Sequence, residues 1–244
     1  MIRGIIVAFI IMFLSQTVSA QGNHISIGIG PSMLYSDNSG IHSDLRFKIE
    51  PAITLSINQQ LNEFIGLRGS IGIQIFNTGE YDPINSRYVI NWGNEDQAFD
   101  FKGRGYFADA VPIFTTNPNS VGKLMSSVQF YAGLGFGLMF VEREQKTLKN
   151  GVLINPVLIN GVTRGELVEG DIITSNETNL IPYVPIRTGI STNLSGDWDF
   201  GVEFVLITAL NSNLDGNNYK YKQVKPDMMG QIQLTAKWYF GPAW

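Results

Sequence analysis

Apolar and polar residues alternate with a period of two along most of the chain. The clearest stretch is GQIQLTAKWYF, from Gly230 to Phe240. In an extended strand, side chains point alternately to opposite faces, so this stretch has one apolar and one polar face. The apolar face carries Ile232, Leu234, Ala236, Trp238 and Phe240, and the polar face carries Gln231, Gln233, Thr235, Lys237 and Tyr239.

The alternation recurs, and together the segments predict an all-β protein of eight strands. The eight segments are His24–Leu34, Asp44–Ile57, Leu67–Ile75, Phe99–Phe114, Val128–Phe140, Leu180–Thr192, Trp198–Ala209 and Gly230–Phe240. A period of two over so many segments indicates sheet rather than helix. Each segment has about ten residues, which is enough for a tilted strand to cross a membrane.

The connections between these segments differ in length. Long connections at residues 36–43, 77–97, 147–179 and 211–225 alternate with others, shorter on average, at residues 58–62, 115–126 and 194–196. Long loops at one end and short turns at the other are typical of bacterial outer-membrane barrels. The pattern therefore predicts an eight-stranded antiparallel up-and-down transmembrane β-barrel whose apolar faces contact lipid and whose polar faces line the interior.

The first twenty residues have the parts of a secretory signal peptide. Arg3 precedes an apolar run from Ile5 to Leu14, and Val18 and Ala20 are the small residues expected before a cleavage site. The apolar run is too short to cross a membrane as a helix. We expect residues 1–20 to be removed and residues 21–244 to form the barrel domain.

Composition narrows the classes of function. The 244-residue chain has a formal net charge of -4 and no cysteine. A mildly acidic chain lacks the basic surface that nucleic acid needs, and the absence of cysteine excludes disulfides and thiolate chemistry.

The polar faces carry charged residues that the barrel prediction places inside. An eight-stranded barrel has a narrow interior filled by side chains, so buried charges there must pair. The candidates are Arg46, Lys48, Glu50, Arg68, Asp100, Lys102, Arg104, Arg187, Asp199, Glu203 and Lys237. We expect Arg187 to lie near Glu203, and Glu50 near Arg68, across the turns between them. The alternative is a thin water path through the barrel.

Aromatic residues lie near the end of the last strand. Trp238 and Phe240 are predicted to sit at the headgroup level of a membrane, where amphipathic rings are favoured. The alternative is that they fill a core.

No catalytic or cofactor motif stands out. The histidines are His24 and His42, and no Gly-x-Ser-x-Gly motif occurs. The segment Asn211 to Tyr219 is rich in oxygen ligands but lacks a calcium-loop frame, which favours a solvated turn. We expect no catalytic site, cofactor or metal.

The connection from Thr147 to Asn179 has apolar clusters in a region predicted to face solvent. A loop this long with its own alternation predicts a hairpin that extends the barrel wall. Exposed apolar residues on it suggest a surface for a protein partner.

The chain resembles the small outer-membrane barrels of the OmpA, OmpX and OmpW kind. The resemblance rests on the VSAQ end of the signal segment, the eight alternating segments and the terminal KWYFGPAW. The later half, including VQFYAGLGFGLMFVERE, resembles PorG-type barrels of bacteroidete cell envelopes, which accompany type IX secretion.

These resemblances imply a location in the outer membrane of a Gram-negative bacterium, in contact with its lipid. The function they imply is structural or accessory, such as holding a partner in a secretion or motility assembly. The alternatives are a small passive channel and a soluble periplasmic lipocalin-like binder.

Overall fold

The computed structural model describes residues 23–36, 48–62, 64–78, 87–116, 128–154, 158–159, 162–163, 167–193, 198–211, 213–218 and 226–240. The predicted signal peptide, Arg46 and His42 lie outside these residues. The elements are β1 (His24–Tyr35), β2 (Ile49–Gln60), β3 (Ile65–Asn77), α2 (Arg87–Asn94), β4 (Asp100–Thr115), β5 (Val128–Leu134), β6 (Phe136–Ile154), β7 (Leu158–Ile159), β8 (Val162–Thr163), β9 (Leu167–Asn193), β10 (Trp198–Ala209) and β11 (Met228–Tyr239).

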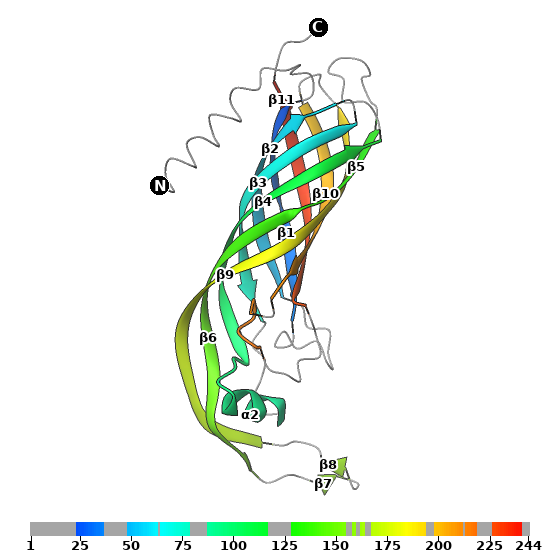
Figure 1. Ribbon diagram of the computed structural model, residues 1–244. Helices are drawn as coiled ribbons and strands as arrows, with labels where there is room; N and C mark the ends of the chain where they lie inside the picture. Colours follow the sequence, from blue (N-terminus) through cyan, green and yellow to red (C-terminus); the bar gives the residue numbers. More distant parts are fainter. Residues whose placement is uncertain are drawn as a thin grey trace, which may run out of the picture.

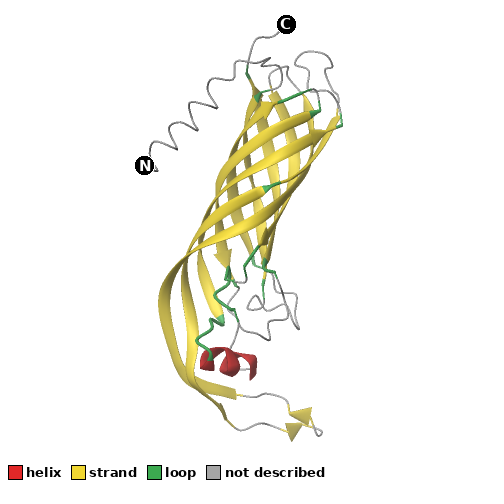
Figure 2. Cartoon of the chain, in the orientation of Figure 1, coloured by secondary structure: helices red, strands yellow, loops and turns green. Residues whose placement is uncertain are grey.

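The large antiparallel sheet closes into a barrel (Figures 1 and 2). Its order is β10-β11-β1-β2-β3-β4-β5-β9-β6, and the additional pairings of β9 with β10 and of β4 with β6 complete the ring. Strands β5 and β6 are two parts of one wall strand, interrupted only at Gly135, because both pair with β4 and β9. The described chain therefore builds the predicted eight-stranded, up-and-down barrel.

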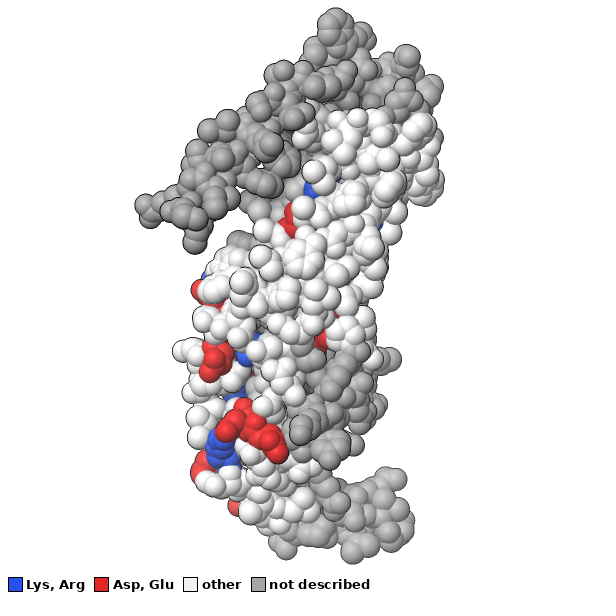
Figure 3. Space-filling model, in the orientation of Figure 1, with Lys and Arg blue, Asp and Glu red and all other residues white. Residues whose placement is uncertain are grey.

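The apolar faces of the strands point outward. On β11, Leu234 is 67% exposed and Ile232 and Trp238 are nearly half exposed, whereas Lys237 is 2% exposed. Outward-pointing Ile, Leu, Val and Phe side chains recur on β1, β2, β3, β5, β6, β9 and β10. Figure 3 shows the result on one face, where the described barrel wall is largely uncharged. This exterior is that of a transmembrane barrel and is incompatible with the water-soluble carrier considered as an alternative.

The interior changes character along the barrel axis. The turn end of the barrel is the end where β2 finishes at Gln60 and β3 begins at Ile65. The hairpin end is the opposite end, where β6 and β9 extend beyond the barrel. Charged and amide side chains fill the turn end and the middle. An apolar cluster closes the interior toward the hairpin end, formed by Leu34, Phe76, Phe101, Phe107, Met139, Val141, Ile181, Tyr183, Val205, Ile207, Ala209, Leu214 and Met229.

Strands β6 and β9 continue as a two-stranded hairpin after their outer neighbours have ended (Figure 1). Strand β4 pairs with β6 as far as Lys146, and β10 pairs with β9 as far as Tyr183. From Tyr183 to Leu167, β9 then runs about 50 Å at the usual rise of a strand. This hairpin confirms that the connection from Thr147 to Asn179 extends the barrel wall.

Helix α2 packs against the base of the hairpin. Its Val89 and Trp92 join Phe99, Leu148 and Val168 in a second buried apolar cluster. Gly93 lies so close to the backbone carbonyl of Leu148 that a side chain there would collide with it. The sequence pattern did not predict this helix. No helix in the described part of the chain is long and apolar enough to cross a membrane.

Candidate functional site

An ionic network spans the barrel interior, centred on Arg187 of β9. Arg187 Nη1 donates to Glu203 Oε1 at 2.7 Å, and its Nη2 donates to Asp109 Oδ2 at 2.8 Å. Arg68 Nη1 lies 2.5 Å from Glu203 Oε2, so Glu203 bridges two arginines. All four side chains are at least 97% buried. Charged hydrogen bonds of this geometry offset the large cost of removing ions from water.

Two tyrosines donate further hydrogen bonds to the carboxylates. Tyr131 Oη donates to Glu203 Oε2 at 2.8 Å, and Tyr183 Oη donates to Asp109 Oδ2 at 3.0 Å. Each ring also covers a glycine on the neighbouring strand, because Tyr131 pairs with Gly189 and Tyr183 with Gly137. The glycines therefore make room inside a narrow barrel for large side chains that anchor the network.

Lys237 extends the network toward the turn end. Its Nζ donates to Ser191 Oγ at 2.9 Å and lies 4.3 Å from the centroid of the Tyr131 ring, a cation–π geometry. Its register partner on β10 is Asp199, which accepts a hydrogen bond of 2.7 Å from Tyr239 Oη. We call Arg68, Asp109, Tyr131, Tyr183, Arg187, Asp199, Glu203 and Lys237 the interior network. The formal charges of these described residues sum to zero.

Amide side chains form a layer between the interior network and the apolar cluster. Gln233 Nε2 donates to Thr54 Oγ1 at 2.8 Å and to Gln231 Oε1 at 2.7 Å, and Gln231 donates to Gln74. Two small cavities beside the interior network have about 10 Å³ each, which is room for about one water molecule. Within the described residues, the interior is therefore filled by side chains rather than open as a pore.

The structure brings five of the predicted interior charges inside the barrel and buries them: Arg68, Arg187, Asp199, Glu203 and Lys237. The expected proximity of Glu50 and Arg68 is wrong. Register places Arg68 opposite Asn58 rather than Glu50, because β2 continues to Gln60 before the chain turns, and Arg68 contacts Glu203 instead. Glu50 is half-buried near the hairpin end.

The placement of Lys102 and Arg104 inside the barrel is wrong. Both are exposed on the outer face of β4, and the inward positions are taken by Phe101 and Phe107. The outer surface of the barrel has an apolar band, formed by the exposed Ile, Leu, Val and Phe side chains, and this part of β4 lies beyond it. Outside the band the outer face meets water and the interior is apolar, as in a soluble protein. The alternation therefore keeps its period, but here the polar residues point outward and the apolar residues point inward.

Asp100 and Lys48 also lie outside the interior network. Asp100 is buried on the same face of β4 as Lys102, where Lys146 Nζ donates to its Oδ2 at 2.8 Å and Thr78 Oγ1 bonds its Oδ1. Lys48 is exposed directly before β2, so its predicted interior position is wrong. Arg46 lies outside the described residues.

Asp109 is the one charged residue of the interior network that the sequence pattern did not predict. It shares the inward face of β4 with apolar Phe107 and Val111, so alternation gave no sign of it. A different signal was present: from Gly105 to Pro118 it is the only acidic or basic residue. A lone carboxylate within a membrane-crossing strand has to point inward to find a partner.

The predicted interface aromatics lie at the turn end. Trp238 is exposed on the outside of β11, and its ring centroid is 6.1 Å from that of half-buried Phe240. Trp238 pairs in register with Trp198 of β10, which stacks on Phe200. Exposed rings at one end of the wall match the aromatic girdle of membrane barrels.

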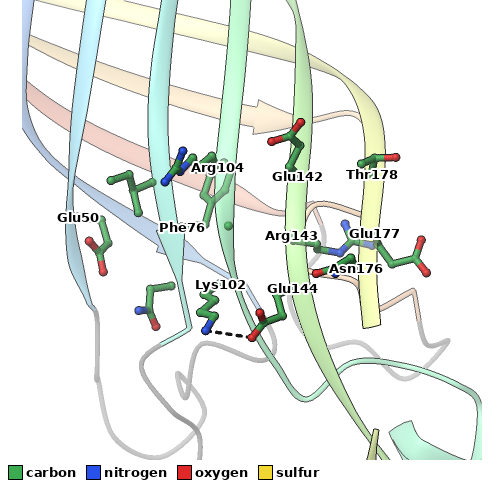
Figure 4. A pocket seen from close by; sticks show the side chains of 13 residues that line it. Glu50, Phe76, Lys102, Arg104, Glu142, Arg143, Glu144, Asn176, Glu177 and Thr178 are labelled. Atoms are coloured by element: carbon green, nitrogen blue, oxygen red, sulfur yellow. Dashed lines mark ion pairs between the residues drawn. The ribbon is translucent and has the colours of Figure 1, made fainter. Parts of the chain in front are cut away.

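A mixed-charge cleft of about 690 Å³ lies at the hairpin end (Figure 4). The side chains labelled there are Glu50, Phe76, Lys102, Arg104, Glu142, Arg143, Glu144, Asn176, Glu177 and Thr178. Lys102 Nζ already pairs with Glu144 Oε1 at 3.0 Å. Since basic and acidic groups are interspersed, the cleft does not select ligands of one charge.

The hairpin presents apolar and acidic side chains to solvent. Val152, Ile172 and Ile173 are about half exposed. Glu169 and Asp171 are exposed nearby. In the parts of the chain that the structure describes, no group of three or more His, Cys, Asp or Glu side chains could hold a metal ion.

Comparison with known proteins gives fold similarities of low strength. No protein-family model matches the chain, and no curated protein matches it. Among solved structures, Neisserial surface protein A (NspA) is 13% identical over 91% of this chain and 99% of its own, with a TM-score of 0.48. Ail, the attachment invasion locus protein of Yersinia pestis, is 14% identical over 89% of this chain and 97% of its own, with a TM-score of 0.44.

The N-terminal β-barrel domain of Pseudomonas aeruginosa OprF is 10% identical over 90% of this chain and all of its own, with a TM-score of 0.39. Similarities this weak establish neither a family nor a function. The barrel assignment therefore rests on the closed strand pairing and on the apolar exterior.

Proposed function

We propose that the protein is a filled outer-membrane barrel of a Gram-negative bacterium whose task is to hold the β6–β9 hairpin outside the membrane for a protein partner. The observation that carries this proposal is the contrast between the two ends of β9. Arg187 is held in a buried ionic network, whereas residues 169–174 and 176–178 are exposed beyond the barrel. A rigid wall that continues into an exposed hairpin is suited to presenting a surface.

The filled interior supports a structural role over the passive channel considered as an alternative. Arg187, Tyr183 and Phe76 are each at most 1% exposed and fill space that a channel would leave to water. The resemblance to PorG-type barrels makes a secretion assembly one class of partner, and this stays a prediction.

Labelling of single cysteines tests both the location and the orientation. The chain has no cysteine, so each introduced thiol is unique. Val152→Cys places a thiol on the exposed hairpin, and Leu61→Cys places one in the exposed turn at the opposite end. In intact cells, a membrane-impermeant maleimide should label Val152→Cys at once and Leu61→Cys only after the outer membrane is permeabilised.

Gln233→Cys is the matched control, because Gln233 is 1% exposed inside the barrel and should stay unlabelled in the folded protein. Labelling of Leu61→Cys but not Val152→Cys in intact cells would mean that the hairpin faces the periplasm. The proposal would then be wrong.

A further inference from the structure

One edge of β9 has no strand partner where the hairpin leaves the barrel. Strand β10 stops pairing with β9 at Tyr183, and β6 occupies the other edge continuously as far as Asp171. Among the described residues, no strand pairs with the outer edge from Ile172 to Leu180. Figure 1 shows β9 on the outer side of the curved hairpin at this height. An exposed strand edge is a template for another extended chain.

The register identifies the backbone groups on this edge. The Pro182 carbonyl accepts from Leu210 N on the β10 side, whereas the Pro185 carbonyl accepts from Gly135 N on the opposite side. In an antiparallel ladder the two directions alternate, and the pairing of β9 with β6 has no shift between Tyr183 and Asp171. The even-numbered residues therefore direct their backbone N–H and C=O groups toward the edge of β9 that no described strand pairs with: Ile172, Thr174, Asn176, Thr178 and Leu180.

The side chains along this edge are acidic or neutral. Glu177 is exposed within this stretch of β9, and Glu169 and Asp171 are exposed directly before it. No lysine or arginine occurs from Glu166 to Ile186. The basic residues on the adjoining part of β6 already have acidic neighbours: Lys146 pairs with Asp100, Lys149 pairs with Asp96, and Arg143 lies near Asp215 and opposite Glu177. An incoming strand therefore meets acidic but no basic side chains on β9 itself.

We propose that this edge binds an extended, basic segment of the partner protein, which adds to the sheet as a strand beside residues 172–180. This inference rests on the proposed function and specifies its partner. Backbone hydrogen bonds to the even-numbered residues provide the affinity, and lysine or arginine side chains at alternate positions face the carboxylates. A second copy of this chain fits less well, because its own β9 edge carries the same acids and like charges would oppose each other.

Peptide binding to the purified protein in non-ionic detergent tests the proposal. The probe is a fluorescent peptide that alternates lysine with valine or threonine. One comparison peptide replaces lysine by glutamate, and another is N-methylated at alternate residues, which blocks its hydrogen-bonding edge. We expect the lysine peptide to bind, the glutamate peptide not to bind, and the N-methylated peptide to bind about ten-fold more weakly, since each lost backbone hydrogen bond contributes a few-fold to affinity.

Two variants of the protein test the same edge. The double substitution Thr174→Pro and Thr178→Pro removes two outward N–H groups without touching the ladder to β6, as proline is tolerated on strand edges. This double variant should bind the lysine peptide about ten-fold more weakly, because it lacks two backbone donors. The matched control, Thr174→Ala with Thr178→Ala, keeps both N–H groups and should bind as the original protein does. An unchanged heat-modifiable gel shift verifies that the barrel remains folded.

Equal binding to the proline and alanine variants would overturn the proposal, as would equal binding of the methylated and unmethylated peptides. Either result would mean that charge alone attracts the peptide. The peptide comparison holds even where the proline variant does not fold. If the peptide does not bind but Val152→Cys is labelled on intact cells, this inference is wrong and the proposed function stands. If the peptide binds but labelling places the hairpin in the periplasm, only the proposed function is wrong.

Discussion

Arg187 and Glu203 face each other diagonally across β9 and β10, with Arg187 Nη1 2.7 Å from Glu203 Oε1. Register places Arg187 opposite Val205 and Glu203 opposite Gly189, and the absence of a side chain at Gly189 leaves room for the Tyr131 ring, whose hydroxyl donates to the carboxylate. Because Glu203 also bonds Arg68 and Tyr131, it joins four strands of the wall. The pair is thus a cross-link inside the barrel rather than an isolated ion pair.

Glu203→Gln should destabilise the folded barrel strongly. The substitution leaves Arg68 and Arg187 buried with one carboxylate fewer, and breaking a buried pair costs about 3–5 kcal/mol. Urea unfolding in detergent, followed by tryptophan fluorescence, measures the loss. Glu144→Gln is the control, because Glu144 pairs with Lys102 in an exposed ion pair, and such pairs contribute about 0–1 kcal/mol. Equal effects of the two substitutions would show that Glu203 has no special structural role.

Gly137→Ala should also destabilise the barrel, because a methyl group at this position would collide with the ring of Tyr183. Overpacking of a filled interior costs about 1–3 kcal/mol. Gly69→Ala is the control, since its added carbon would lie 3.8 Å from the nearest atom, on Ile57. The midpoint of urea unfolding should fall for the first variant only. A similar midpoint for both variants would mean that the Tyr183 side chain can shift to accommodate the added methyl group at little cost.

The purified protein should show no steady single-channel openings in planar bilayers. The apolar cluster, the amide layer and the interior network fill the described interior in succession, and the two cavities beside the interior network each hold about one water molecule. A large porin recorded under the same conditions supplies the positive control. Steady openings would favour the passive channel and would require the interior network to rearrange.

Trp92→Ala should loosen the hairpin without opening the barrel. Trp92 of α2 packs with Leu148 and Val168, so its removal leaves a cavity at the base of the hairpin. Hydrogen exchange of the backbone amides of β6 near Leu148 should become faster, while exchange near Arg187 stays slow. Val152→Ala, at an exposed position, is the control. Faster exchange throughout the wall would mean that α2 supports the whole barrel.

The fold was predictable from sequence because a lipid exterior and a polar interior impose the same period of two on every strand. Residues such as Leu234 and Lys237 display that rule directly. Lys102 and Arg104 follow the same period, but they point outward instead of inward. They do so because they lie beyond the apolar band, where the outer face of the strand meets water. The sequence does not state where that band ends.

Helix α2 was not predictable for a different reason. Its apolar Val89 and Trp92 pack against Leu148 and Val168, which lie far along the chain, as well as against the nearer Phe99. The interior network was predicted in part, since Arg187 and Glu203 flank a short connection. Asp109 joins them through closure of the whole barrel, which depends on register between strands distant in sequence.

The orientation of the strands is tested most directly on β11. Single cysteines at residues 231–235, each carrying a nitroxide, report accessibility to dioxygen, which concentrates in hydrocarbon, and to a nickel chelate, which stays in water. In lipid vesicles, Ile232 and Leu234 should show high dioxygen and low nickel accessibility, and Gln231, Gln233 and Thr235 should be inaccessible to both. High nickel accessibility at Ile232 and Leu234 would place those side chains in water and contradict a membrane-spanning barrel.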